Sequence, residues 1–171
     1  RQPDDPEFDA LIAVDVEREI AALADDLELL AWFVDQLGDL LSDAGLEGDL
    51  LVRLRTLSLE LEEELAQQDN EPYSLLWSMR SLAALLRRRG DFQQAEALYQ
   101  RCQSTAEHHF GVLSQEAQVS IDDLAGLYRD AASFSKAESL YRQVLQQSHR
   151  CFGYRHPSTL DTVSNLARLY A

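Results

Sequence analysis

The chain has 171 residues, of which 46% are hydrophobic and 26% charged, and with only 7 Gly and 4 Pro its composition is typical of a helical globular protein. Residues 1–71 contain 21 acidic and 4 basic residues, a net charge of −17, whereas residues 72–171 carry a net charge of +2. The acidic first part argues against nucleic acid and membrane as partners, because nucleic acids and anionic membranes require a concentrated positive surface.

The ends of the chain and its cysteines bear on where the protein works. Arg1 is not an initiator Met, and the sequence stops inside a helical pattern, so we expect a fragment of a longer protein. No apolar run reaches the roughly 18 residues of a membrane span. Cys102 and Cys151 lack the spacing of a disulfide framework, which favours a reducing, cytoplasmic location.

Residues 1–71 are expected to form an acidic, coiled-coil-like helical hairpin. Between Ala13 and Leu41 the apolar residues alternate spacings of four and three, which predicts one long helix. The stretch SDAGLEGD breaks this pattern, and Leu50, Leu54, Leu57 and Leu61 predict a second, shorter helix antiparallel to the first. The long stripe includes Ile20, Leu23, Leu27, Leu30, Val34 and Leu37.

This stripe could pair with another chain, as a homodimer or with a partner helix, or pack within its own chain. Gly38 interrupts the seam, and Trp32 and Phe33 widen the apolar face beyond that of a two-stranded coiled coil. These features favour intrachain packing.

An internal repeat with an offset of 42 residues organises residues 72–171. The segment LAALLRRRGDFQQAEALYQR, from Leu82, aligns with LAGLYRDAASFSKAESLYRQ, from Leu124. Within each unit, apolar residues recur at i, i+3, i+4 and i+7, which predicts two amphipathic helices, A and B. Since one unit cannot bury its apolar face alone, the units must stack. The ladders are Leu82–Leu124–Leu166, Ala83–Ala125–Ala167, Phe92–Phe134, Ala95–Ala137, Tyr99–Tyr141, Phe110–Phe152 and Gly111–Gly153.

This pattern resembles the tetratricopeptide repeat, and its period, its Leu-Ala-x-Leu-Tyr and Ala-Glu-x-Leu-Tyr helices and its Phe-Gly…His-Pro connector are similar to the kinesin light chain subtype. The resemblance implies an all-α fold, in which the hairpin precedes a right-handed α-α superhelix. The repeats are expected at about 73–112 and 113–154, with the first helix of a third at about 156–171. The usual Gly of the turn between helices is Ala132 in the second repeat.

The resemblance also implies a protein-interaction scaffold or adaptor that holds a peptide in the concave groove lined by the A helices. Arginines gather on this face, and guanidinium groups bind carboxylates bidentately, so an acidic peptide or partner helix is expected, with room for its backbone at Ala84 and Gly126. In the other interpretation the arginines pair with Asp122, Asp123, Asp130 or the acidic hairpin. The predicted groove residues are Arg80, Ala84, Arg87, Arg88, Asp122, Gly126, Arg129, Asn165 and Arg168.

Three other roles are open. The repeats could be the regulatory or sensor domain of a larger enzyme or signalling ATPase, or the hairpin could be an oligomerisation module. Residues 1–71 could also mask the arginine groove intramolecularly, because tethering raises effective concentration.

No catalytic residue, metal site or cofactor is expected. Acidic neighbours such as Asp25 and Asp26 point apart on a helix and make a poor acid/base pair. Imidazole and thiolate groups that could bind zinc gather near the ends of successive B helices, at His108, His109, His149, Cys151 and His156, but histidines at helix C-termini are more simply explained by the helix dipole. We therefore predict that the chain is not an enzyme.

Overall fold

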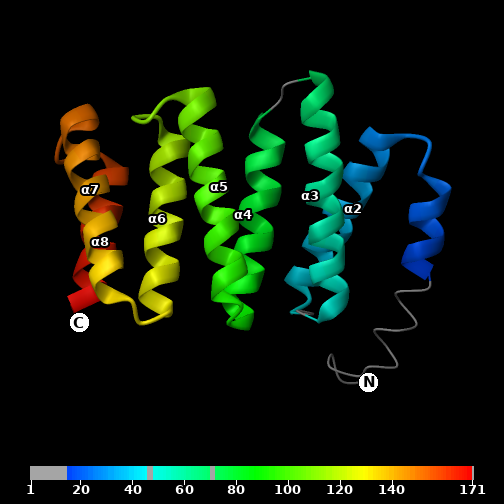
Figure 1. Cartoon of the computed structure of the whole chain (residues 1–171), viewed down its shortest axis with the longest axis horizontal. Coiled ribbons are helices and arrows are strands. Elements are labelled where there is room, and N and C mark those ends of the chain that lie inside the picture. The colour runs from blue at the N-terminus through cyan, green and yellow to red at the C-terminus, as the bar shows by residue number, and fades with distance from the viewer. Residues whose placement is uncertain (1–14, 46–47, 70–71, 171) are drawn as a thin grey trace. The chain divides into compact units, whose positions relative to one another are not determined.

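The computed structural model describes residues 15–45, 48–69 and 72–170, and these residues form helices and turns with no strand (Figure 1). The all-α prediction is confirmed. A short helical stretch, residues 15–22, comes before the named helices. The helices are α2 (Leu27–Asp43), α3 (Asp49–Asp69), α4 (Pro72–Arg89), α5 (Phe92–Phe110), α6 (Gln115–Asp130), α7 (Phe134–Phe152) and α8 (Pro157–Tyr170).

The chain divides into two compact units, Arg1–Leu85 and Leu86–Ala171, so that the division lies within α4. None of the helices in the described residues is both long and apolar enough to cross a membrane.

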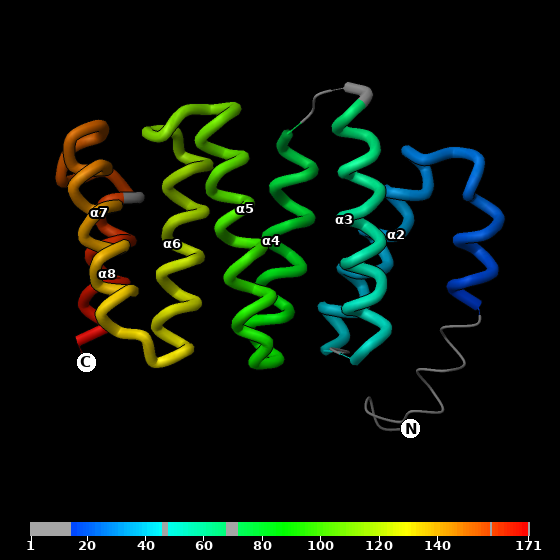
Figure 2. The backbone as a smooth tube through the Cα atoms, viewed as in Figure 1, coloured from blue at the N-terminus to red at the C-terminus, as the bar shows by residue number. Residues whose placement is uncertain are grey.

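In the first unit α2 and α3 form the predicted antiparallel hairpin, which the tube in Figure 2 traces. The two helices bury a leucine-rich core between them. Its best-buried members include Val34 on α2 and Leu51 on α3, each 1% exposed. The alternation of apolar and charged residues along both helices therefore encodes the hairpin.

The prediction of one helix from Ala13 to Leu41 is wrong, and Ala13 itself lies outside the described residues. Helical structure ends at residue 22, a turn follows, and α2 begins at Leu27. The cause is Asp26, whose backbone is extended and whose carboxylate accepts a hydrogen bond of 3.0 Å from the Leu29 N–H. Such an N-cap satisfies a backbone donor that a new helix leaves free.

The stripe considered as an oligomer or partner face is packed inside its own chain. Leu30 and Val34 are buried, and the other four residues are partly buried against the same core cluster. This burial agrees with the intrachain interpretation. The four are Ile20, Leu23, Leu27 and Leu37.

Gly38 lies under a buried arginine from the facing helix. The Arg55 side chain on α3 is 7% exposed, and its guanidinium donates to Asp35 Oδ1 at 2.8 Å and also to Asp39. A Cβ added to Gly38 would lie 3.0 Å from Arg55 Cζ. Burial raises the pKa of Asp35 above its usual value, and the charge of Asp39 adds to this, while Arg55 and Trp77 oppose it. Gly38, which interrupts the apolar stripe, thus makes room for a guanidinium group.

In the second unit α5, α6, α7 and α8 pack in chain order, and α6 also contacts α8. Ala95 and Ala137, at equivalent positions of the two repeats, are completely buried. Tyr99 and Tyr141, also equivalent, are 2% and 1% exposed. The small alanines let neighbouring helices approach closely, while the tyrosine rings fill the space between them.

The turn between helices A and B keeps one backbone conformation in both repeats despite a change of residue. Gly90 has φ of +87° in the first repeat, and Ala132 has φ of +55° in the second. A Cβ in this left-handed region costs about 1–2 kcal/mol. The repeat fold therefore imposes the turn on Ala132.

Candidate peptide-binding face

The predicted groove residues lie on three helices. Arg80, Ala84, Arg87 and Arg88 are on α4, Asp122, Gly126 and Arg129 on α6, and Asn165 and Arg168 on α8. Arg80 and Ala84 belong to the first unit and the others to the second. Apart from Arg88, the predicted residues of the second unit form two groups, one around Asp130 and one around Asp122.

Arg87 and Arg129, called here the arginine pair, converge on the carboxylate of Asp130. Arg87 Nε donates to Asp130 Oδ2 at 2.6 Å, and Arg129 Nε donates to Asp130 Oδ1 at 3.1 Å. The side chains of Arg87 and Arg129 are 23% and 26% exposed, and that of Asp130 is 37% exposed. One carboxylate is thus held by two half-buried guanidinium groups, in agreement with the interpretation that paired the arginines with Asp130.

The guanidinium of Arg87 is held firmly in its charged form. Burial lowers the pKa of this group, but the hydrogen bond and negative charge of Asp130, with a smaller contribution from Tyr99, raise it. The net pKa lies above the ordinary value for arginine. Arg87 is therefore a permanent positive charge on this face.

Gly126 is filled rather than open. It is buried, and a Cβ added to it would lie 2.9 Å from an Nη atom of Arg87. The prediction that Gly126 leaves room for a peptide backbone is wrong, because the guanidinium of the neighbouring A helix occupies that room. The glycine instead lets Arg87 reach across α6 to Asp130.

The second group centres on the partly buried acid Asp122. Asn165 Nδ2 donates to Asp122 Oδ2 at 2.7 Å, and Arg168 donates to Asn165 Oδ1. Burial raises the pKa of Asp122, and the charges of Asp123 and Asp161 add to this, whereas the hydrogen bond from Asn165 lowers it. A cavity of about 190 Å³ opens beside these three acids. This part of the face disfavours a further carboxylate.

Arg88 lies exposed in the last turn of α4. Basic side chains there complement the negative end of the helix dipole.

The sequence analysis missed a cavity in the first unit, which is lined by both tryptophans of the chain.

Comparison with known proteins identifies the repeats. The family model described as "Tetratricopeptide repeat" matches residues 75–115 and 119–158. No curated protein matches the chain as a whole or in part.

Two solved structures share the fold. BtubC (BKLC) from P. vanneervenii has a TM-score of 0.67 and 23% sequence identity to this chain. The match covers 95% of this chain but 64% of BtubC, so this chain spans less than two thirds of the length of BtubC. A protein from Podosopora anserina with nearly identical TPR-like repeats, assigned as a kinesin light chain, has a TM-score of 0.74 and 21% identity. The match covers 91% of this chain and 74% of that protein. Residues 75–115 and 119–158 are therefore tetratricopeptide repeats, and the chain shares the fold of these solved structures.

Proposed function

We propose that the chain is a protein-interaction scaffold and that its arginine pair binds a carboxylate of an acidic partner peptide. Tetratricopeptide repeats are generally protein–protein interaction scaffolds. The observation that carries the proposal is the convergence of Arg87 and Arg129 on Asp130, with four N–O distances of 2.5–3.1 Å. Two converging guanidinium groups form a ready-made carboxylate site.

In this proposal Asp130 is a resident carboxylate that a partner replaces. Its side chain is 37% exposed and comes from the last residue of α6, so it can turn toward solvent with little loss of packing. Binding then exchanges one charge-assisted contact for another. This exchange lowers the affinity for the acidic partner, because the contact with Asp130 must be broken first. It raises the selectivity for acidic over uncharged peptides, because an uncharged group cannot displace Asp130.

The Asp130→Asn variant should bind acidic peptides more tightly. The amide keeps the shape of the carboxylate but loses its charge, so the arginine pair is released for a partner. We expect the dissociation constant of a fluorescein-labelled hexapeptide of alternating Glu and Leu to fall about threefold to tenfold, measured by fluorescence anisotropy.

Asp161→Asn is the matched control, because it removes the same charge from α8 of the same unit without touching the arginine pair. An equal gain in both variants would assign the effect to overall charge. An unchanged or weaker affinity in Asp130→Asn would contradict the proposal.

The Arg87→Glu/Arg129→Glu double variant should lose partners that the wild-type chain captures from a lysate. Reversing two charges repels a carboxylate at the point where the wild-type chain attracts it, and remaining binding should no longer weaken with added salt. Capture is compared by quantitative mass spectrometry, with circular dichroism as the check on folding.

Arg142→Glu/Arg150→Glu on α7 is the control, since it makes the same change of charge at two exposed residues of a B helix. Partners that both double variants retain would place binding on another surface.

The remaining parts of the proposal are coarser. We propose that the scaffold works in the cytoplasm, as its tetratricopeptide repeats suggest. We also propose that it has no catalytic activity and no cofactor, because tetratricopeptide repeats typically serve as non-catalytic scaffolds. A regulatory role within a larger enzyme, dimerisation through the hairpin, and masking by residues 1–71 are alternatives, and light scattering tests dimerisation. Masking predicts that removal of residues 1–71 increases affinity for the acidic hexapeptide.

A further inference from the structure

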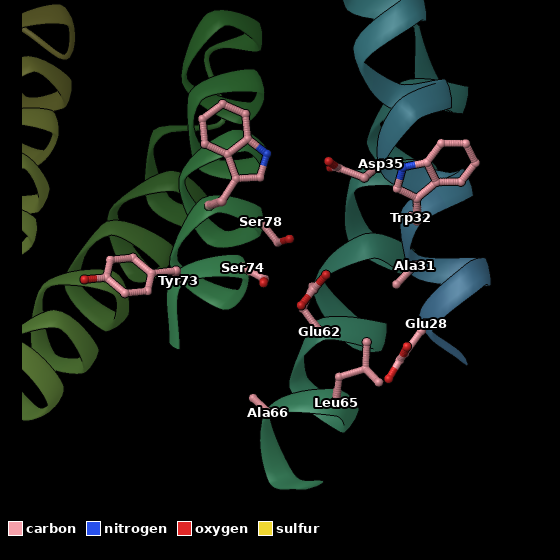
Figure 3. Close-up of a pocket in the computed structure, with 11 residues that line it drawn as sticks. Glu28, Ala31, Trp32, Asp35, Glu62, Leu65, Ala66, Tyr73, Ser74 and Ser78 are labelled. Carbon is pink, nitrogen blue, oxygen red and sulfur yellow. The ribbon is translucent and has the colours of Figure 1, made fainter. Parts of the chain in front are cut away.

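A cavity of about 530 Å³ lies among α2, α3 and the first half of α4, entirely within the first unit (Figure 3). We call it the tryptophan cavity. Pockets of about 300–1,000 Å³ are typical of small-molecule binding sites, so the cavity is large enough to admit a side chain. The residues that decide its chemistry are Trp32, Trp77, Tyr73, Glu28, Asp35 and Glu62.

Aromatic side chains in this cavity are unusually exposed. Trp32 is 61% exposed, Tyr73 57% and Trp77 51%. Indole rings bury large areas in cores and interfaces, and their faces attract cations. Rings left open beside a cavity therefore offer binding area to a guest.

The cavity is acidic, and none of the described residues that line it is basic. Asp35 is already engaged, because it accepts hydrogen bonds from Arg55 and from the indole of Trp77. Asp35 thereby orients one of the two rings. In Figure 3 the carboxylates of Asp35 and Glu62 lie on the α2 and α3 side, turned toward Ser74 and Ser78 of α4.

Glu62 is a second carboxylate of the cavity, and it has no counter-charge within the described residues. Its side chain is partly buried and accepts a hydrogen bond from Ser74. Burial raises the pKa of Glu62, and the nearby charge of Asp35 adds to this. A cation bound in the cavity would offset both effects by its positive charge. An apolar guest would instead remove water from an unpaired charge, which is costly.

We propose that the tryptophan cavity binds an arginine side chain from a basic segment of a partner protein. The planar guanidinium stacks on an indole face and donates to Glu62, which a compact, strongly hydrated ammonium group does less well. The charge preference is opposite to that of the arginine pair. The cavity is thus a second, independent interaction site, which would allow the scaffold to hold two partners of opposite charge.

The chain contains 2 Trp residues, and both line the cavity, so tryptophan fluorescence reports on this site alone. The probe is a blocked peptide with one arginine between glycines, compared with the same peptide carrying citrulline, which has the same shape but no charge. We expect a saturable change in emission with the arginine peptide. The citrulline peptide should bind at least about tenfold more weakly.

Glu62→Gln tests the proposed anchor, and Glu64→Gln, an exposed residue of the same helix outside the cavity, is its control. Glu62→Gln should weaken binding of the arginine peptide about tenfold and Glu64→Gln should leave it unchanged. Glu62→Gln removes the energetic cost of burying a charge, so the variant should fold. The NMR resonances of its two indole N–H groups report directly on whether it has folded. Equal binding of the two peptides, or wild-type affinity in Glu62→Gln, would overturn the proposal.

Discussion

Replacing Tyr141 by Ala is expected to lower the free energy of unfolding by about 3–5 kcal/mol. Tyr141 is 1% exposed and packs with the fully buried Ala125 and Ala137 in the core of the second unit. Removing the ring leaves a cavity between helices that cannot close without moving one of them. The loss is read from urea unfolding followed by circular dichroism.

Two variants separate the ring from other effects. Tyr141→Phe keeps the ring and removes only the hydroxyl group, so it should cost less than about 1.5 kcal/mol, the upper end of what one hydrogen bond contributes. Tyr154→Ala makes the same truncation at a residue that is 71% exposed, and it should cost under about 1 kcal/mol. A Tyr141→Ala loss no larger than that of Tyr154→Ala would show that the packing between repeats tolerates a void.

The second large effect is expected for Arg55→Ala, which should cost about 2–3 kcal/mol at neutral pH. Breaking a buried pair commonly costs about 3–5 kcal/mol, but Asp39 is 45% exposed and water can screen part of the charge left behind. The substitution leaves Asp35 without its guanidinium and opens a void above Gly38. Urea unfolding followed by tryptophan fluorescence reports on the first unit, where both tryptophans lie.

Arg53→Ala is the matched control, since Arg53 also lies on α3 and pairs with a carboxylate, that of Glu17, but its side chain is 64% exposed. This variant should cost about 0–1 kcal/mol. Equal losses in the two variants would mean that the burial of Arg55 has no energetic weight.

The cost of Arg55→Ala should also depend on pH. The pKa of Asp35 is raised above its ordinary value first by burial, with Asp39 adding to the effect and with Arg55 and Trp77 opposing it. An acid with a raised folded-state pKa loses stability as pH rises through that pKa, and loss of Arg55 raises the pKa further. Glu62 on α3 is a further negative charge near Asp35, and it also disfavours the ionised form of Asp35. The loss of unfolding free energy caused by Arg55→Ala should therefore be smaller at about pH 5 than at about pH 7.5.

The repeat region was predictable because its signal is redundant. Leu82, Leu124 and Leu166 recur at one offset, and the helices that follow from them match α4 to α8. The break before α2 was missed for a physical reason. Leu23 and Leu27 keep the apolar spacing across the turn, so the stripe continues although the backbone does not, and only the cap at Asp26 marks the new helix.

The candidate face was predictable in its register but not in its contacts. The offset places Arg87 and Arg129 at equivalent positions of successive A helices. Which acid they contact depends on long side chains with several rotatable bonds, and of the acids considered it is Asp130 that they share. The tryptophan cavity was not predictable, because its residues come from three helices with no common sequence spacing.

The two arginines that lie over glycines have a mechanical consequence. Arg55 lies over Gly38 in the first unit, and Arg87 lies over Gly126 in the second. Since every other residue type carries a Cβ, sliding either helix by one residue, about 1.5 Å along its axis, brings a Cβ against the guanidinium and separates it from its carboxylate. Each pair therefore favours one axial register between two neighbouring helices.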